Sequence, residues 1–538
     1  MAAVALTSAV PRPHEPILPC CMHRRKINII GAGPGGLAAA MLLSRTGAEV
    51  NVFERRGQPG GRTSVLQRDG FTWDVGATFF MYPRVLEEIF KSAGRSMHDE
   101  IPMVKLDPHY RLVFGGGGEI TATPDVDRLK AEISRYSPED AAAVDRFLAD
   151  NRRKLAAFKP VLERPFNGWR DLVRTDMLKC LPLLRPTASV DADLRRYFRD
   201  PRTRLAFSFQ TKYLGMSPYR CPSLFTILSF LEYEYGIFHP IGGCGAITAA
   251  MARVAGELGV KIHLNEEVEG MEFNGRRATA VRTRSGTHAH DALVINSDFA
   301  RTMQRLVPDQ LRRRWSNRKL GKSKFSCSTF MLYLGLKGRC DDIAHHNIFI
   351  SAGYEENLRQ IEKEHTIPTD PSFYVQNPCV SDSTLAPEGH CVLYVLVPVP
   401  HQHANIDWAR EKEAFASRIL DRMELLGVRN VRERIVSQTV VTPDEWAQDQ
   451  QIHLGATFNL AHNFGQMLHW RPRNRFEDLE GVYLTGGGTH PGSGLPVIFE
   501  SARISSGLIE HDLGLSPSPA AHEELDPAEH AVQEMAVS

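Results

Sequence analysis

The sequence predicts an α/β fold divided into several domains, and three observations lead to this prediction. A short apolar segment, 26–30, runs into a glycine-rich turn and then into an Ala- and Leu-rich stretch, 37–45, with the composition of a helix. A similar strand, glycine loop and helix return near the end of the chain, at 481–484 and 498–511. The chain has 538 residues, which is too many for one compact unit, so other segments must be inserted between these two pieces.

The first turn has the GxGxxG spacing of a dinucleotide-binding loop. It consists of Gly31, Ala32, Gly33, Pro34, Gly35 and Gly36. Gly31 permits the tight turn, Gly33 lets the backbone approach a pyrophosphate, and Gly36 lets helix and strand pack closely. The helix that follows presents free N–H groups and a partial positive charge to phosphates. Glu54 ends the second strand, 23 residues after Gly31, where an acid that binds the ribose hydroxyls is expected. These features predict a Rossmann-like domain.

A second glycine element follows Glu54 and distinguishes between FAD and NAD. After Arg55, which we include in the predicted cofactor site, the chain continues to Gly60, Gly61 and Arg62. The two glycines bring backbone close to a cofactor, and the arginine offers a charged fork to a pyrophosphate. This element resembles the second signature of the flavoproteins that include amine oxidases and carotenoid desaturases. The resemblance implies FAD as the cofactor, and residues 74–78 resemble the turn of that group near the isoalloxazine ring.

Two later segments extend this resemblance. Val268 enters a strand where the main chain of such enzymes meets the adenine, although a plain core residue is an equally simple interpretation. The loop 486–496 resembles the closing signature of the bacterial-type phytoene desaturases. The resemblance to this family covers nearly the whole chain, about 26–513. The resemblance implies flavin contacts at Gly487, Gly488, Gly494, Leu495 and Pro496.

The resemblance and the pattern together give the expected domain organisation. We expect a Rossmann-like FAD-binding domain assembled from discontinuous segments, an inserted α+β substrate domain, and a helical region that could associate with a membrane. The expected segments are a flexible tail (1–25), the FAD-binding domain in three parts (26–106, 241–324 and 470–515), a helical region (107–240), a substrate domain (325–469) and a disordered tail (516–538). Three short strands, 268–273, 278–283 and 292–295, are expected to form a meander.

The resemblance implies an FAD-dependent desaturase that introduces conjugated double bonds into a long apolar carotenoid precursor such as phytoene, by hydride transfer to the flavin. Four alternatives stay open: a carotenoid oxygenase or aldehyde-forming enzyme, a carotenoid isomerase, an amine oxidase, and a non-enzymatic prenyl-binding escort protein. The segment 496–500 departs from the family pattern close to where the flavin is expected. No catalytic residue is assigned. The titratable residues expected nearest the ring are His490, Glu500 and Asp74.

Two segments suggest how an apolar substrate is handled. The stretch 224–238 combines aromatic and aliphatic residues, which suits either a buried helix or the wall of an apolar tunnel. The stretch 164–186 is basic, amphipathic and carries Trp169, which suits either a helix packed on the body or one lying in a membrane interface. Because a carotenoid resides in the membrane, we favour the interface.

Composition excludes several other classes. The net charge of +1 gives no overall reason to bind nucleic acid, and the seven basic residues within 311–324 most simply form a solvated face or contact anionic lipid. Nine cysteines without a CxxC pair, and histidine pairs without partner ligands, predict neither disulfides nor a metal site. We therefore expect a cytoplasmic, peripherally membrane-associated protein whose electron acceptor is a quinone or oxygen.

Overall fold

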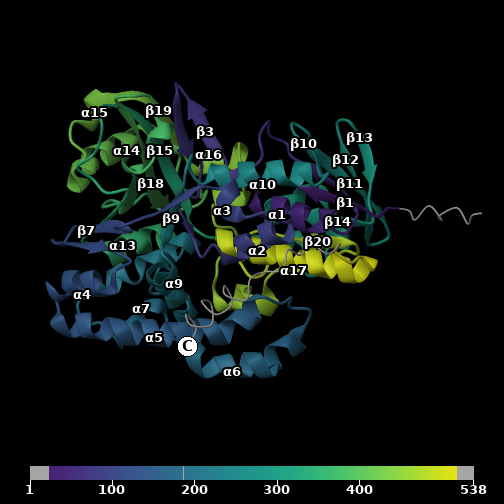
Figure 1. Ribbon diagram of the computed structural model, residues 1–538, viewed down its shortest axis with the longest axis horizontal. Helices are drawn as coiled ribbons and strands as arrows, with labels where there is room; N and C mark the ends of the chain where they lie inside the picture. Colours follow the sequence, from purple (N-terminus) through teal and green to yellow (C-terminus); the bar gives the residue numbers. More distant parts are fainter. Residues whose placement is uncertain (1–23, 186, 518–538) are drawn as a thin grey trace, which may run out of the picture.

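The computed structural model describes residues 24–185 and 187–517 (Figure 1). The tails predicted to be flexible or disordered, 1–25 and 516–538, lie almost entirely outside these described residues.

The first unit is a parallel sheet of five strands in the order β10-β2-β1-β14-β20. Its strands are β1 (Lys26–Ile30), β2 (Glu49–Phe53), β10 (Lys261–His263), β14 (Ala292–Ile295) and β20 (Val482–Leu484). They come from the beginning, the middle and the end of the chain, so the sheet is complete only when segments far apart in sequence meet. The buried helix α1 (Pro34–Ser44) contacts α10 (Gly245–Glu257) and α17 (Leu495–Leu513), and the three share one apolar core with the sheet.

The meander differs from the predicted one. Strands β11 (Val268–Asn274) and β12 (Arg277–Thr283) pair as expected, but the third strand is β13 (Gly286–Ala289). The segment that we expected as the third strand is β14, which joins the parallel sheet instead. All four residues of β14 are buried, whereas β13 is largely exposed. A strand that is apolar on both faces suits a parallel sheet covered on both sides.

The second unit is a sheet of seven strands in the order β19-β15-β18-β17-β16-β7-β8. Its strands are β7 (Tyr110–Phe114), β8 (Glu119–Ala122), β15 (Ser328–Lys337), β16 (His346–Ile350), β17 (Phe373–Gln376), β18 (His390–Val399) and β19 (Ile435–Val441). The first two lie in the segment 107–240 that we expected to be helical. In β7 every second residue is fully buried, and this period of two is typical of a strand with one face on a core. Smaller pairings join β3 (Val65–Arg68) to β4 (Phe71–Asp74), and β9 (Ile237–Pro240) to β5 (Phe80–Met81) and β6 (Met103–Lys105).

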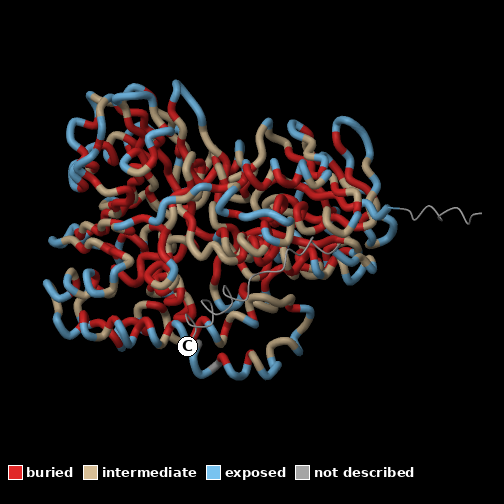
Figure 2. Tube along the Cα trace, in the orientation of Figure 1, coloured by how far each residue is buried: buried red, intermediate tan, exposed pale blue. Residues whose placement is uncertain are grey.

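Helices cover the seven-stranded sheet and form a third region beneath it in Figure 1. The helices on this sheet are α13 (Tyr354–Arg359), α14 (Trp408–Arg422), α15 (Val431–Arg434) and α16 (Pro443–Gln448), whereas α11 (Phe299–Leu306) and α12 (Asn317–Lys322) pack beside the first sheet, in one core with β11 and β14. The helical region contains α4 (Val126–Ser134), α5 (Pro138–Leu162), α6 (Thr175–Leu184), α7 (Val190–Leu194), α8 (Pro201–Ala206) and α9 (Ile227–Tyr235), and α2 (Arg84–Ser92) and α3 (Met97–Glu100) precede it. Buried residues run continuously through all three regions in Figure 2. No helix within the described residues is long and apolar enough to cross a membrane.

Candidate active site

The glycine turn between β1 and α1 leaves no room for side chains. Gly31 has a φ of +96°, which only glycine adopts readily, and its N–H donates to Phe53 O at 2.9 Å. A Cβ on Gly36 would lie 2.2 Å from Gly31 O, so helix and turn meet backbone to backbone. Helix α1 begins at Pro34, and no side chain caps its N-terminus. Its first N–H groups therefore remain free for an anion.

The side-chain carboxylate of Glu54 stabilises this glycine turn. Its carboxylate accepts hydrogen bonds from Ala32 N and Arg56 N, both at 2.9 Å. Gly60 N donates to Ala32 O at 2.7 Å, so the second glycine element is tied to the first. Glu54 also faces the cavity described below, where its remaining lone pairs can accept from a ribose.

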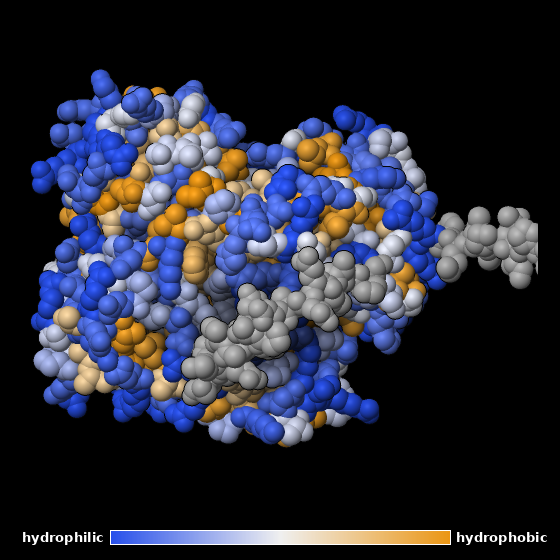
Figure 3. Space-filling view, viewed as in Figure 1, coloured by the Kyte–Doolittle hydropathy of each residue, from blue (hydrophilic) through white to orange (hydrophobic). Residues whose placement is uncertain are grey.

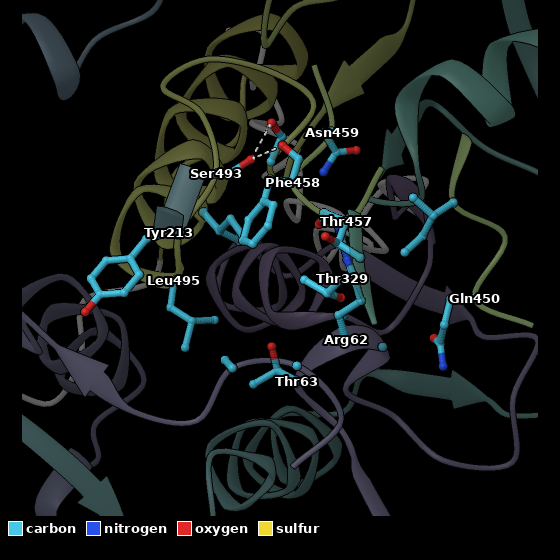
Figure 4. A pocket seen from close by; sticks show the side chains of 18 of the residues that line it. Arg62, Thr63, Tyr213, Thr329, Gln450, Thr457, Phe458, Asn459, Ser493 and Leu495 are labelled. Atoms are coloured by element: carbon cyan, nitrogen blue, oxygen red, sulfur yellow. Dashed lines mark hydrogen bonds between the residues drawn. The ribbon is translucent and has the colours of Figure 1, made fainter. Parts of the chain in front are cut away.

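The two predicted arginines reach across to the segment 449–459. Arg55 donates to Asp449 O and Arg62 donates to Thr457 O. Figure 4 shows the Arg62 side chain beside Thr457 and Asn459, with Leu495 and Tyr213 on the other side of the view. Both arginines keep further N–H groups for a ligand.

These elements line one cavity of about 550 Å³, which runs from the α1 N-terminus to the seven-stranded sheet. Thirteen of the predicted cofactor residues line it: Gly31, Gly33, Pro34, Glu54, Arg55, Gly61, Arg62, Val268, Gly487, Gly488, Gly494, Leu495 and Pro496. The other four, Ala32, Gly35, Gly36 and Gly60, lie behind the wall and support the turns through backbone contacts. Open helix N–H groups, bare glycine backbone and cationic side chains on one cavity fit a dinucleotide.

Two supporting residues carried no signal in the sequence. Asn296 follows β14, and its Nδ2 donates to Gly31 O at 3.1 Å, so it fixes the turn from the neighbouring strand. Arg471 is fully buried and donates to Gly487 O at 2.6 Å and Thr489 O at 3.0 Å. It thereby fixes the closing loop from within. The Asn296 contact joins segments 265 residues apart, whereas Arg471 lies 16 and 18 residues before the loop residues that it contacts.

Three tyrosines of the seven-stranded sheet hold the turn 74–78 at the far side of the cavity. Tyr333 donates to Val75 O at 2.6 Å, and Tyr394 donates to Gly76 O at 2.8 Å. The Tyr374 hydroxyl lies 2.9 Å from Thr78 Oγ1. Sequence reasoning missed all three, because each tyrosine is simply an alternating strand residue until the sheet meets the turn.

The three titratable residues expected nearest the ring do not line the cavity. Asp74 accepts from Gly245 N at 3.1 Å, and burial raises its pKa to about 6. Burial, with the charge of Arg471 as a smaller cause, lowers the pKa of His490 to about 3. Glu500 pairs with Arg503 at 3.2 Å, while burial raises its pKa to about 7.

The residues of the segment 496–500, which departs from the family pattern, lie in two different surroundings. Val497 and Ile498 line the cavity, whereas Phe499 packs on Phe80 in the core and, like Glu500, does not line the cavity. Of the changed residues, Val497 and Ile498 therefore line the cavity in which the flavin is expected, and Phe499 and Glu500 do not.

The stretch 224–238, expected as a buried helix or a tunnel wall, contributes little to the apolar part of the cavity wall. From the stretch 224–238, only Leu228 and Leu231 line the cavity, while the aromatic residues of that stretch pack elsewhere. The aromatic wall comes instead from Phe79, Tyr110, Phe209, Tyr213, Phe349, Phe373, Tyr374, Tyr394 and Phe458. A long cavity lined in this way suits an apolar ligand beside a polar cofactor.

A buried carboxyl stands behind this wall. Glu232 accepts from Tyr213 OH at 2.8 Å, and from Tyr110 OH and Gln210 Nε2 at 2.9 Å. Burial outweighs these hydrogen bonds and raises the pKa of Glu232 to about 7.

No group of three metal-ligating side chains occurs among the described residues.

Comparison with known proteins agrees with the geometry. Residues 34–509 match the family described as flavin containing amine oxidoreductase, and the chain is therefore an FAD-dependent oxidoreductase of that family. Within it, the chain belongs to the bacterial carotenoid desaturases. It is 42% identical to the 4,4'-diapophytoene desaturase (4,4'-diapolycopene-forming) of a Methylomonas species, over 90% of this chain and 95% of the relative. It is 35% identical to the phytoene desaturase (lycopene-forming) of Pseudescherichia vulneris, over 91% and 100%.

Solved structures share the fold. An oxidoreductase from Methanosarcina mazei superposes with a TM-score of 0.60 and 18% identity, over 90% of this chain and all of that one. Putrescine oxidase bound to putrescine superposes with a TM-score of 0.62 and 15% identity, over 91% and 99%. The predictions of an α/β flavoprotein fold, of FAD and of the family are thus confirmed.

Proposed function

We propose that this protein is an FAD-dependent desaturase that introduces conjugated double bonds into a long apolar carotenoid precursor such as phytoene or 4,4'-diapophytoene. The observation that carries the proposal is the continuous cavity, which has a backbone-lined polar end for a dinucleotide and another end lined mainly by aromatic and aliphatic side chains. Relatives of 32–42% identity that span nearly the whole chain are named as carotenoid desaturases or dehydrogenases.

FAD supplies a hydride acceptor when it is bound, and the protein supplies binding and orientation. The glycine turn and the α1 N-terminus would hold the pyrophosphate, Glu54 the ribose, and Val268 the adenine end. The loop 487–496 and the turn 74–78 would flank the ring. The apolar wall would align the polyene and exclude water, which is how alignment lowers the barrier.

The test is to incubate the FAD-loaded protein with liposomes that carry phytoene, 4,4'-diapophytoene or lycopene, and to weigh the products. Loss of hydrogen pairs is the expected result. Added oxygen would indicate an oxygenase or aldehyde-forming enzyme, and an isomer of unchanged mass would indicate an isomerase. A purified protein that never takes up FAD would contradict the proposal.

We also propose that the protein docks on a membrane surface through an apolar patch around α6, because its substrate resides there. The patch consists of Trp169, Val173, Leu178, Leu183, Phe464 and Trp470, with Trp169 64% and Trp470 48% exposed. The 3₁₀ turn Trp169–Val173 contacts the turn Leu468–Trp470, which contacts Phe464–Gln466. Elsewhere, on the face shown in Figure 3, apolar side chains form scattered groups among hydrophilic ones.

The basic segment 311–324 supports this docking. Arg314 donates to His469 O at 2.6 Å, which places the segment beside Trp470. Arg312 is buried, but Arg313, Arg318, Lys319, Lys322 and Lys324 are exposed and could contact anionic lipid. Cosedimentation with anionic vesicles tests this. Replacing Trp169 and Trp470 with Ser should release the protein, whereas Leu425→Ser, which alters an exposed leucine outside the patch, should not.

We propose that a quinone or oxygen would be the final acceptor of the electrons that bound FAD takes from the polyene. Reoxidation of the flavin by a soluble quinone under argon, compared with reoxidation by oxygen alone, distinguishes these two acceptors.

A further inference from the structure

One buried histidine of the cavity wall lacks a partner for one of its ring nitrogens. His346 begins β16, is 2% exposed, and is the only histidine that lines the cavity among the described residues. Its Nδ1 lies 2.8 Å from the Tyr374 hydroxyl, but no described residue offers a hydrogen-bond partner to Nε2. A buried nitrogen without a partner is costly unless a ligand or substrate meets it.

The position of His346 relative to the flavin end of the cavity is fixed by a short chain of hydrogen bonds. Tyr374 OH lies 2.9 Å from Thr78 Oγ1, and Thr78 belongs to the turn that two further tyrosines hold at the ring end. Phe79, the next residue, packs edge-on against the His346 ring at 5.4 Å. His346 is therefore connected through Tyr374 to the turn that would face the ring.

The surroundings keep His346 neutral. Burial, and then the neighbouring His345, His239 and His109, lower its pKa well below the ordinary value. In the neutral imidazole, Nδ1–H donates to the Tyr374 oxygen and Nε2 keeps a lone pair. The hydrogen bonds that join Thr78, Tyr374 and His346 fix the direction of this lone pair.

We propose that His346 Nε2 accepts the proton that desaturation removes from the polyene, with Tyr374 as the residue that positions it. This inference rests on the proposed function. In each desaturation, one carbon loses a hydride to the flavin, the bonding pair of the neighbouring C–H bond becomes the new π bond, and the proton of that C–H bond binds to Nε2. One polyene is oxidised by two electrons and one flavin is reduced.

The proton bound to His346 must then leave the cavity, and a second histidine, His345, contacts His346. The His345 ring lies edge-on to His346 with the ring centroids 4.4 Å apart, and His345 Nδ1 lies 3.0 Å from Ser381 Oγ. Ser381 is partly exposed. These contacts extend from His346 through the His345 ring to a partly exposed serine, which is the route that the proposal assigns to the departing proton.

The test separates polyene binding from chemistry. FAD-loaded protein is mixed without oxygen with liposomes that carry phytoene or 4,4'-diapophytoene, and the loss of flavin absorbance is followed in one turnover. Polyene affinity is measured separately by quenching of flavin fluorescence. For His346→Gln we expect flavin reduction to slow by about 100-fold or more, the usual effect of removing a general base, with polyene affinity and FAD content unchanged. For Tyr374→Phe we expect a smaller slowing, about 10-fold, with the same unchanged affinity.

His290→Gln is the matched control. Both ring nitrogens of His290 are also buried without a partner among the described residues, but His290 neither lines the cavity nor affects the pKa of His346, so its variant should reduce flavin at about the wild-type rate. Reduction at the wild-type rate in His346→Gln would overturn the inference and leave the proposed function intact. Equal loss of FAD or of polyene affinity in the His346 and His290 variants would also overturn it, since it would assign His346 a structural role. A wild-type protein that no polyene reduces would overturn both.

Discussion

The two ends of the cavity are built from different materials. The dinucleotide end consists of backbone: Gly31, Gly33 and the first turn of α1 meet the cavity with almost no side chain. The far end consists of side chains from a sheet that is distant in sequence, where Tyr333, Tyr374 and Tyr394 hold the turn 74–78 by their hydroxyls. The first end should therefore fail when atoms are added, and the second when polar atoms are removed.

Adding atoms to the glycine turn should have the largest effect. In Gly36→Val the new Cβ would lie 2.2 Å from Gly31 O, and neither backbone can yield. We expect a colourless protein that has lost FAD binding and several kcal/mol of unfolding free energy. The ratio of flavin to protein absorbance checks this. Gly507→Ala is the control, because a Cβ there meets nothing within 4 Å.

Removing the buried Glu232 carboxyl, which lies behind the aromatic wall of the cavity, should change how the free energy of unfolding depends on pH. The folded-state pKa of Glu232, about 7, lies above its ordinary value of 4.5, so between these values only the folded protein holds the proton. Stability from this group is complete below about pH 4.5 and is lost as pH rises through about 7, by up to about 3 kcal/mol.

Glu232→Gln should abolish this component, and denaturant unfolding of both proteins across pH 4.5–8 measures it. A parallel pH dependence in the two proteins would contradict the assignment to Glu232.

Removing one charge at the dinucleotide end should weaken FAD without emptying the site. Glu54→Gln leaves the backbone turn in place but weakens the acceptor of Ala32 N and of the ribose. Because hydrogen bonds to charged groups contribute about 1.5–3 kcal/mol, we expect the Kd for FAD to rise by roughly 10- to 100-fold. Titration of the apoprotein with FAD checks this, and an unchanged Kd would show that the backbone alone binds the cofactor.

Removing one hydroxyl at the far end should have the smallest effect. Tyr333→Phe leaves Val75 O without its donor, which should cost about 1–3 kcal/mol of unfolding free energy. FAD content should stay near the wild-type value, since the glycine turn is untouched. Tyr235→Phe, at an exposed ring, serves as the control and should have almost no effect on unfolding.

The dinucleotide end of the cavity was easier to predict from the sequence than the far end. The bounds of β1 and β2 agree with the structure, and so do the positions of α1 and α17, because strand, turn and helix lie within one short stretch of chain. The third strand of the meander was wrong, because β13 and β14 differ in burial rather than in local pattern. The strands β7 and β8 were missed although they pair with each other locally, and β7 joins the sheet through β16, more than 200 residues away, as in the pairing of Leu112 with Ile348.

By itself, the sequence determined the glycine turn and the class of cofactor, since glycine spacing and backbone conformation are local properties. Only the tertiary structure decided which side chains line the cavity. Asp74, His490 and Glu500 are close to the flavin signatures in sequence but do not line the cavity, whereas His346 and Tyr374 line it from the seven-stranded sheet. Long-range packing brings these residues together, because a side chain's surroundings depend on elements that its own segment does not encode.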